Sequence, residues 1–176
     1  MNFELPEHVQ MIQDTVRKFV NAEMPRSAAA MWDKDNHFPR DVFGRLAELG
    51  TTGLTIPEQY GGSGRDILAT MIVIEELAKR SMAVAVPYIM AVCYAGMNLV
   101  DCASEGQKQQ LLPRVANGEL LFAYGWTEPD AATDLASIST TATRDGDDLI
   151  VNGSKRFCSG AAFADFIYTL VKTDFD

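Results

Sequence analysis

Apolar residues change their spacing near Gly118, and this change limits the chain to folds in which a helical part precedes a sheet. Before Gly118, Val9, Ile12 and Val16 recur every three or four positions, as on one face of an amphipathic helix. After Gly118, residues 137–143 are rich in hydroxyl and β-branched side chains, which is typical of strands. We therefore predict an α+β chain: an N-terminal all-α helical domain over residues 1–118, followed by an incomplete antiparallel β-barrel-like domain over residues 119–176.

Turn and cap signals divide the helical part. Pro25 is expected to end the first helix and Gly50 to close the second. Asp66 is a candidate N-cap for the third helix. Ser104 and Gln107 have the spacing of a capping box, which indicates the start of another helix.

The strand part is bounded by two turn signals. Residues 145–148 form a turn pattern, and residues 149–151 and 163–171 are predicted strands. Asn152-Gly153 predicts a hairpin with a type I′ turn. About four strands leave apolar edges open. We therefore expect that more chain follows Asp176 in the natural protein, or that another chain covers the edge.

One long segment carries no charge and is therefore a candidate membrane span. Ser81 to Val100 comprises twenty uncharged residues, close to the ~20 that cross a bilayer. Pro87 is expected to interrupt it, which leaves about thirteen residues for one unbroken helix. This length favours a buried core helix over a membrane span.

Charge and cysteine content exclude several classes of partner. The 176-residue chain has a formal net charge of −9, which argues against nucleic acid as its main ligand. It has three cysteines, too few for a disulfide framework, and no cationic and apolar leader, so we predict a cytoplasmic protein. His8 and His37 lie in polar contexts without a metal-ligand pattern, and the chain lacks a Gly-x-Ser-x-Gly motif, so we predict neither a metal site nor a Ser-His-Asp site.

Two other polar patterns are interpreted as structural. Gly61-Gly62-Ser63-Gly64 fits neither the dinucleotide fingerprint nor the P-loop, so it predicts a tight loop that needs positive φ. Glu75 and Glu76 are followed four positions later by Lys79 and Arg80. This spacing predicts two surface ion pairs, Glu75–Lys79 and Glu76–Arg80, rather than an acid–base pair.

One face of the predicted uncharged helix carries sulfur-containing and aromatic side chains. Met90, Cys93, Tyr94 and Met97 recur in steps of three, one and three. Core packing is the first interpretation, because methionine fills irregular gaps. The alternative is the wall of a pocket for a flexible apolar ligand, with Met90 and Tyr94 as candidate substrate contacts.

Aromatic and hydroxyl side chains gather at the ends of two strand segments. The first segment ends in Tyr124-Gly125-Trp126-Thr127, and the second in Phe157-Cys158-Ser159. Rings of this kind can cover the face of a flat heteroaromatic ligand, and hydroxyls can meet its rim. Core packing remains the alternative, because alternating aromatic residues on a strand are usually buried.

Several ordered motifs resemble those of the acyl-CoA dehydrogenase family. Residues 56–62, Ile-Pro-Glu-Gln-Tyr-Gly-Gly, are similar to the family's Pro-Glu-x-Tyr-Gly-Gly turn, and residues 75–78 resemble the helix that follows it. Thr127-Glu128-Pro129 resembles the start of the Thr-Glu-Pro-Gly-Ala-Gly-Ser-Asp signature, and residues 152–159 resemble the Asn-Gly-x-Lys-x-Trp/Phe-Ile-Thr strand. The resemblance covers nearly all of the chain.

The resemblance implies a flavoprotein that binds FAD on its β-domain and acts on an acyl-CoA thioester. Thr127 would bond the pyrimidine edge of the flavin, Phe157 would cover its ring, and Ser159 would donate towards N5. The implied cofactor-facing residues are Tyr124, Gly125, Trp126, Thr127, Ala132, Thr133, Phe157, Cys158 and Ser159. Thr133, Met90 and Tyr94 would contact the substrate, and an electron-transfer flavoprotein or similar acceptor and a homo- or hetero-oligomer are implied as partners.

Two departures from the family pattern limit what is implied. The Gly-Ala-Gly-Ser segment is Asp130-Ala131-Ala132-Thr133 here, which places a methyl group and a charge near the expected phosphates. The carboxylate base of the family lies in a C-terminal domain, and no residue here corresponds to it. The chain would thus be part of an acyl-CoA dehydrogenase that forms a 2-enoyl-CoA. The alternatives are a non-catalytic binding or regulatory subunit, or a related flavin oxidase, monooxygenase or enoyl-CoA reductase.

Overall fold

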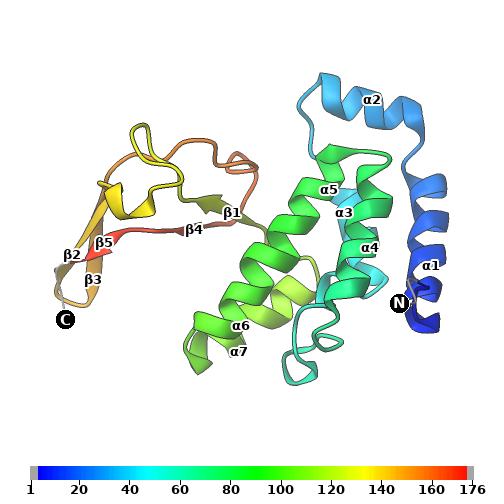
Figure 1. The fold of residues 1–176 in the computed structure, drawn as a ribbon, viewed down its shortest axis with the longest axis horizontal. Coiled ribbons are helices and arrows are strands. Elements are labelled where there is room, and N and C mark those ends of the chain that lie inside the picture. The colour runs from blue at the N-terminus through cyan, green and yellow to red at the C-terminus, as the bar shows by residue number, and fades with distance from the viewer. Residues whose placement is uncertain (1–3, 174–176) are drawn as a thin grey trace. The chain divides into compact units, whose positions relative to one another are not determined.

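The computed structural model describes residues 4–173, and the chain divides into two units, Met1–Leu121 and Phe122–Asp176 (Figure 1). The first unit is helical: α1 (Glu7–Glu23), α2 (Arg26–Lys34), α3 (Arg40–Glu48), η1 (Thr51–Gly53), η2 (Glu58–Tyr60), α4 (Ile67–Ala78), α5 (Met82–Ile89), η3 (Met90–Met97), α6 (Asn98–Cys102) and α7 (Glu105–Ala116). The second holds β1 (Phe122–Gly125), η4 (Leu135–Ser137), β2 (Thr141–Asp145), β3 (Asp148–Asn152), β4 (Phe166–Thr169) and β5 (Lys172–Thr173). The α+β class is confirmed, with a sheet that is partial and not closed.

The helix boundaries follow the cap residues. Pro25 separates α1 from α2, and Gly50 lies beyond the end of α3 with a φ of 76°, a conformation that glycine adopts freely. The Asp66 carboxylate accepts from the Ala69 amide at 2.8 Å and caps α4. Ser104 and Gln107 form both bonds of the capping box that opens α7. These four predictions are therefore confirmed.

The glycine-rich loop after η2 depends on two different properties of glycine. Gly61 and Gly64 have φ values of 84° and 103°, as the tight-loop interpretation expects. Gly62 is needed for a different reason, because a Cβ atom there would lie 1.9 Å from the carbonyl oxygen of Ile56. The loop is thus a structural turn of the helical unit.

The uncharged segment forms one helix, and Pro87 does not interrupt it. Residues Met82–Cys102 run through α5, the π-helical η3 and α6 without a break. The expected break at Pro87 is therefore wrong. Pro87 removes one backbone donor, but it and Tyr88 are buried in the core of the unit, so packing outweighs the missing bond.

The π-helical η3 is held by a side chain from another segment. The buried Thr55 hydroxyl donates to the carbonyl of Val92 at 2.7 Å. Gly96 permits this approach, because a Cβ on that residue would lie 2.8 Å from Thr55 Oγ1. The wider turn therefore has a specific partner for a carbonyl in η3.

By length and composition, Met82–Cys102 is also able to cross a membrane. In the structure, 56 % of its most apolar window is buried inside the protein. Its buried residues include Val84, Tyr88, Val92 and Leu99. This packing fits the predicted core helix.

Of the two predicted ion pairs, Glu75–Lys79 is present and Glu76–Arg80 is wrong. Glu75 does pair with Lys79, at 2.7 Å. Glu76 does not pair with Arg80; it is 4 % exposed and accepts from Arg17 (2.9 Å), Gln13 (3.0 Å) and Lys79 (3.0 Å). Arg80 instead reaches the C-terminal carbonyls of α1, at Val20 and Met24. The side-by-side packing of α1 and α4, visible in Figure 1, explains both changes.

We expect the Glu76 cluster to stabilise the helical unit in a pH-dependent way. Burial alone would raise the pKa of Glu76, but hydrogen bonds from Arg17 and Lys79 outweigh it and hold that pKa below its ordinary 4.5. Because the pKa is lower in the folded chain than in the unfolded chain, the charged carboxylate contributes its full stabilisation above pH 4.5. This stabilisation is lost progressively as the pH falls below 4.5 and through the lowered pKa. Glu76→Gln should therefore lower the free energy of unfolding by about 2 kcal/mol at pH 7 and flatten its acid dependence.

Urea unfolding of wild-type and Glu76→Gln chains between pH 7 and pH 3 measures this contribution. Glu58→Gln serves as the matched control, because Glu58 is exposed. Equal acid slopes for the wild type and Glu76→Gln would contradict the assignment.

The second unit contains two small sheets. β1 pairs with β4 in parallel, and Phe122 and Tyr124 lie opposite Phe166 and Tyr168. The other sheet has the order β3-β2-β5, in which β2–β3 is antiparallel and β2–β5 is parallel. Antiparallel pairing, expected from adjacent strands, thus holds for the β2–β3 hairpin only. The crossing segment 153–165 carries the chain to β4, which explains the parallel pairs.

The β2–β3 hairpin turns at residues 145–148, as predicted, with Gly146 at a φ of 61°. The second predicted hairpin, at Asn152-Gly153, is wrong, because no strand pairs with β3 beyond this point in the described chain. Gly153 serves close packing instead. A Cβ on Gly153 would lie 2.6 Å from the Cα of Thr140.

Candidate functional site

Two segments of the second unit lie side by side and carry most of the predicted site residues. The Arg156 amide donates to the carbonyl of Thr127 at 2.7 Å. The Lys155 ammonium donates to the carbonyl of Trp126 at 3.2 Å. The end of β1 and the segment that contains Phe157, Cys158 and Ser159 are thereby joined.

A buried carboxylate holds this junction together. Glu128 is 4 % exposed and accepts from the amide and hydroxyl of Ser139 (2.6 and 2.7 Å), the amide of Thr140 (2.9 Å) and the ammonium of Lys155 (2.8 Å). The hydrogen bond from Lys155 is the main reason that the pKa of Glu128 lies far below its ordinary range. The carboxylate is therefore charged and ties three segments into one frame.

From the sequence, Glu128 and Lys155 were noted only as members of two motifs, and their ion pair was not predicted. Glu128 directly follows Thr127 in one of the motifs quoted above, and Lys155 lies two positions before Phe157 in the other. The two motifs were expected to meet, and one contains an acidic residue and the other a basic residue. This combination is the signal that could have revealed the Glu128–Lys155 pair.

The rings of the site form a stack. The ring centroids of Tyr124 and Trp126 are 4.6 Å apart, and those of Tyr124 and Tyr168 are 5.8 Å apart. Tyr168 was not predicted; it joins the site because β4 lies beside β1. The indole Nε1 of Trp126 is buried and has no hydrogen-bond partner among residues 4–173. A buried donor without a partner is unusual in a folded protein and needs an explanation.

Phe157 has a strained backbone and an exposed ring. Its φ is 56°, in the left-handed region that a residue with a side chain rarely adopts. Its side chain is nevertheless 77 % exposed, and the Arg156 guanidinium lies over the ring at 4.8 Å. A conformation of this kind costs about 1 kcal/mol or more, and such residues cluster at binding sites. The ring is thus displayed rather than packed.

Three hydroxyl groups of the predicted site form no hydrogen bond within the part of the chain that the structure describes: those of Thr127, Thr133 and Ser159. Thr127 is half-buried, and Thr133 and Ser159 are exposed. Ala132 and Thr133 lie in a loop that folds back where the Glu128 amide donates to the carbonyl of Ala131, at 2.7 Å. No recorded contact joins this loop to Phe157 or Ser159.

The two predicted substrate contacts of the helical unit differ in exposure. Met90 is 2 % exposed and lies in the core, as the packing interpretation expects. Tyr94, one turn later in η3, is 38 % exposed. Tyr94 is therefore the residue of this pair that can reach a ligand from the folded helical unit.

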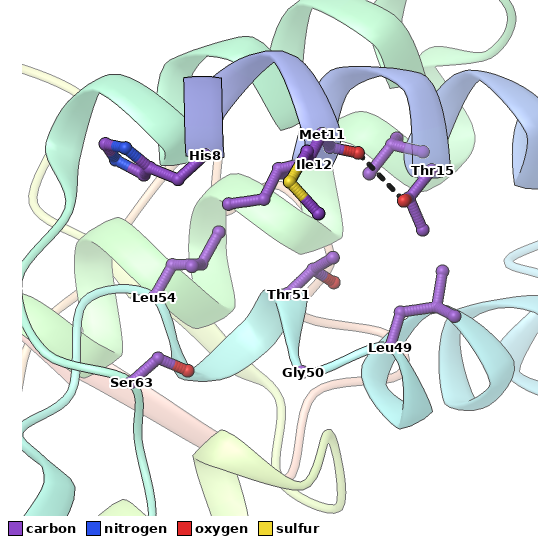
Figure 2. A pocket seen from close by; sticks show the side chains of 10 residues that line it. His8, Met11, Ile12, Thr15, Leu49, Gly50, Thr51, Leu54 and Ser63 are labelled. Atoms are coloured by element: carbon purple, nitrogen blue, oxygen red, sulfur yellow. Dashed lines mark hydrogen bonds between the residues drawn. The ribbon is translucent and has the colours of Figure 1, made fainter. Parts of the chain in front are cut away.

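The helical unit also has a surface cavity of about 370 Å³, shown in Figure 2. Side chains of α1 line one side, and side chains from the end of α3, η1 and the glycine loop line the other. The lining is mostly apolar and contains none of the predicted site residues: His8, Met11, Ile12, Thr15, Val16, Leu49, Gly50, Thr51, Leu54 and Ser63. Its hydroxyls are already engaged in part, since Thr15 donates to the Met11 carbonyl at 2.8 Å.

No group of three or more His, Cys, Asp and Glu side chains within residues 4–173 has an arrangement that could hold a metal ion.

Two family models match the chain. The model of the acyl-CoA dehydrogenase N-terminal domain matches residues 6–119, and that of the acyl-CoA dehydrogenase middle domain matches residues 123–176. Glutaryl-CoA dehydrogenase of Desulfococcus multivorans is 41 % identical over 177 aligned residues, which are 99 % of this chain and 45 % of that protein. The chain spans about half the length of the curated relatives that it matches.

Solved structures agree with the family match. A glutaryl-coenzyme A dehydrogenase in complex with glutaryl-CoA has a TM-score of 0.92 at 41 % identity, with 99 % of this chain and 45 % of that chain covered. An acyl-CoA dehydrogenase from Bacillus anthracis complexed with FAD has a TM-score of 0.88 at 28 % identity, with 97 % of this chain and 30 % of that chain covered.

Proposed function

Because the chain belongs to the acyl-CoA dehydrogenase family, we propose that it forms part of an FAD-dependent enzyme that oxidises an acyl-CoA thioester to a 2-enoyl-CoA. Residues 1–118 would be its helical domain and residues 119–176 part of its middle β-domain. The catalytic carboxylate base would lie outside this chain. Alone, the chain would bind ligands without turning them over.

The displayed ring of Phe157 beside the end of β1 is the observation that carries this proposal. A strained backbone presents an apolar ring to the outside, and the preceding residue, Arg156, donates to the carbonyl of Thr127 through its amide. A flat isoalloxazine ring fits these neighbours, because it can cover Phe157 and accept from unpaired donors at its rim. The Glu128–Lys155 frame would fix the two segments before FAD binds.

Each proposed role follows from a group that the structure leaves available. The Thr127 hydroxyl would donate to the pyrimidine edge of the flavin, and the Ser159 hydroxyl would donate towards N5. Tyr124, Trp126 and Phe157 would exclude water from the ring. When bound, FAD supplies the hydride acceptor of the reaction. The hydroxyl donors would then stabilise negative charge on the reduced cofactor.

On the substrate side, Thr133 of the second unit would contact the thioester. In the helical unit, Tyr94 would contact the substrate, and Met90 lies in the core of that unit. An electron-transfer flavoprotein or a similar acceptor would reoxidise the enzyme, within a homo- or hetero-oligomer. Cys93, Cys102 and Cys158 are free thiols, which supports a reducing compartment, and we propose the cytoplasm.

Flavin binding by the chain tests the proposal, with Phe157→Ala as the informative variant. Loss of the ring should weaken FAD binding about fivefold, measured by quenching of flavin fluorescence, because one stacking contact is worth about 1 kcal/mol. Folding stability should stay unchanged, since the side chain is largely exposed. Leu149→Ala removes another exposed apolar side chain, from β3, and should leave FAD binding unchanged.

The whole protein gives the second readout. It should be yellow as purified and should form a 2-enoyl-CoA from an acyl-CoA when an electron acceptor is present. A colourless preparation that FAD does not reconstitute would overturn the proposed function.

A further inference from the structure

The chain contains two asparagine–glycine pairs, and they lie in different structural settings. Asn117-Gly118 follows the end of α7, and Asn152-Gly153 lies at the end of β3. Both asparagine side chains are exposed. Glycine has no Cβ to shield its amide nitrogen from the side chain of the residue before it. The two pairs therefore offer the same local chemistry, and the fold decides whether it can proceed.

The pair after α7 is closed by hydrogen bonds and packing. The Gly118 amide donates to the carbonyl of Val115 at 3.0 Å. Gly118 has a φ of 71°, and a Cβ there would lie 2.5 Å from the Cβ of Ala47. The amide of Asn117, the C-cap residue, donates to the carbonyl of Pro113 at 3.1 Å. The main chain of this pair is therefore held in place, and its glycine amide is already engaged.

The pair at the end of β3 is open. Asn152 is the last residue of the strand and lies opposite Thr141, at the end of the β2–β3 ladder. Gly153 is exposed and lies beyond the ladder. Neither the Asn152 side chain nor the Gly153 amide makes a hydrogen bond with residues 4–173. Both reacting groups of this pair are thus accessible and without a competing partner in the described chain.

From this contrast we propose that Asn152 is a site of spontaneous deamidation and that the fold confines the reaction to it. The Gly153 nitrogen attacks Cγ of Asn152 and gives up its proton. The bond from Cγ to the side-chain nitrogen breaks, ammonia leaves with that proton, and a cyclic succinimide remains. Water then opens the ring at either carbonyl, so the product is aspartate or isoaspartate. The reaction consumes one water molecule and involves no change of oxidation state.

The isoaspartate product would disturb the frame around Glu128. Its main chain contains an additional methylene group, directly before Gly153. A Cβ on Gly153 would already lie 2.6 Å from the Cα of Thr140, so the main chain has little room to shift there. The Thr140 amide donates to Glu128, and Lys155, two residues after Gly153, binds the same carboxylate. We therefore expect the second unit to be less stable after the reaction than before it.

Incubation of the 176-residue chain at mildly alkaline pH, followed by peptide mass mapping, tests the site. The peptide with Asn152 should gain the mass difference between an amide and an acid at least about tenfold faster than the peptide with Asn117. The chain in concentrated urea is the control. Without structure, the two pairs should react at rates within about twofold of each other. Asn152→Gln should abolish the fast mass gain and leave the rate at Asn117 unchanged.

The unfolding midpoint of the second unit gives a second readout. It should fall in incubated wild-type chains and stay constant in Asn152→Gln chains incubated in parallel. Asn152→Asp carries the new charge on an ordinary main chain, so it should lose less stability than the incubated wild type.

Two results would overturn the proposed site: equal rates for Asn152 and Asn117 in the folded chain, or a mass gain at Asn152 in urea only. An unchanged midpoint after conversion of Asn152 would overturn its effect on the Glu128 frame. The experiment contains no flavin, so its outcome is independent of the proposed dehydrogenase function.

Discussion

A Lys155→Met chain should lose much of the stability of its β unit, with an unfolding midpoint lowered by roughly 10 °C. The Glu128 carboxylate is 2 % exposed in its side chain and Lys155 only 12 %, so the substitution leaves a buried charge without its cation. Three donors from Ser139 and Thr140 remain, but none of them carries a charge. Since the same frame joins Thr127 to Phe157, FAD binding should fall together with stability.

Trp126 reports this loss directly, because its carbonyl accepts from Lys155. In a Trp32→Phe background, Trp126 is the single tryptophan of the chain, and its fluorescence follows the β unit alone. Lys172→Met, an exposed cation on β5, is the control and should leave the midpoint within about 2 °C.

The pH dependence of the same unit follows from the lowered pKa of Glu128. The carboxylate stabilises the folded unit fully above its ordinary pKa of 4.5, and this contribution is lost as the pH falls below that value. The wild-type midpoint should therefore drop on acidification more steeply than that of Lys155→Met. Parallel curves would contradict the role of the pair.

Gly62→Ala should lower the free energy of unfolding of the helical unit by about 3 kcal/mol or more. The added methyl would lie 1.9 Å from the Ile56 oxygen and 2.7 Å from the Gly53 oxygen. Both are backbone atoms, and both already accept hydrogen bonds from the same loop, at Gly64 and Ser63. The loop therefore has no flexible side chain that could move aside.

Gly106→Ala is the matched control with the opposite sign. Gly106 lies inside α7, and a Cβ there meets nothing within 4 Å. Alanine should raise stability by about 0.5–1 kcal/mol, because it restricts the unfolded chain and favours the helix. Urea unfolding of both variants measures the contrast. A Gly62→Ala chain as stable as the wild type would show that the loop can relax.

Local chemistry made the fold predictable to a large extent. The helical spacing before Gly118, the caps at Asp66 and Ser104 and the turn at Gly146 depend on neighbours in sequence, and the structure has each of them. The resemblance implied that the two site segments lie at one edge, and the structure does join them, through the bond from Arg156 to Thr127; that this edge binds a flavin stays a prediction.

Long-range packing decided what sequence reasoning missed. Glu76 is buried against α1, so its partner is Arg17 and not the residue four positions on. Glu128 and Lys155 are 27 positions apart, and Tyr168 reaches Tyr124 only through the parallel β1–β4 pair. Asn152-Gly153 has the composition of a turn, yet Gly153 is there to let the chain pass Thr140.

The π-helical stretch sets the direction in which Tyr94 and everything after it in the helix faces. A π-turn takes up one residue more than the α-turn that it replaces, and one residue of α-helix corresponds to a rotation of about 100°. Without the Thr55 contact to Val92, the same sequence wound as a plain α-helix would keep Val84 and Tyr88 inward but rotate Ala95 and Leu99 away from the core. The hydrogen bond from Thr55 to Val92 thus lies at the point where the helix changes which of its later side chains face the core and which, like Tyr94, face outward.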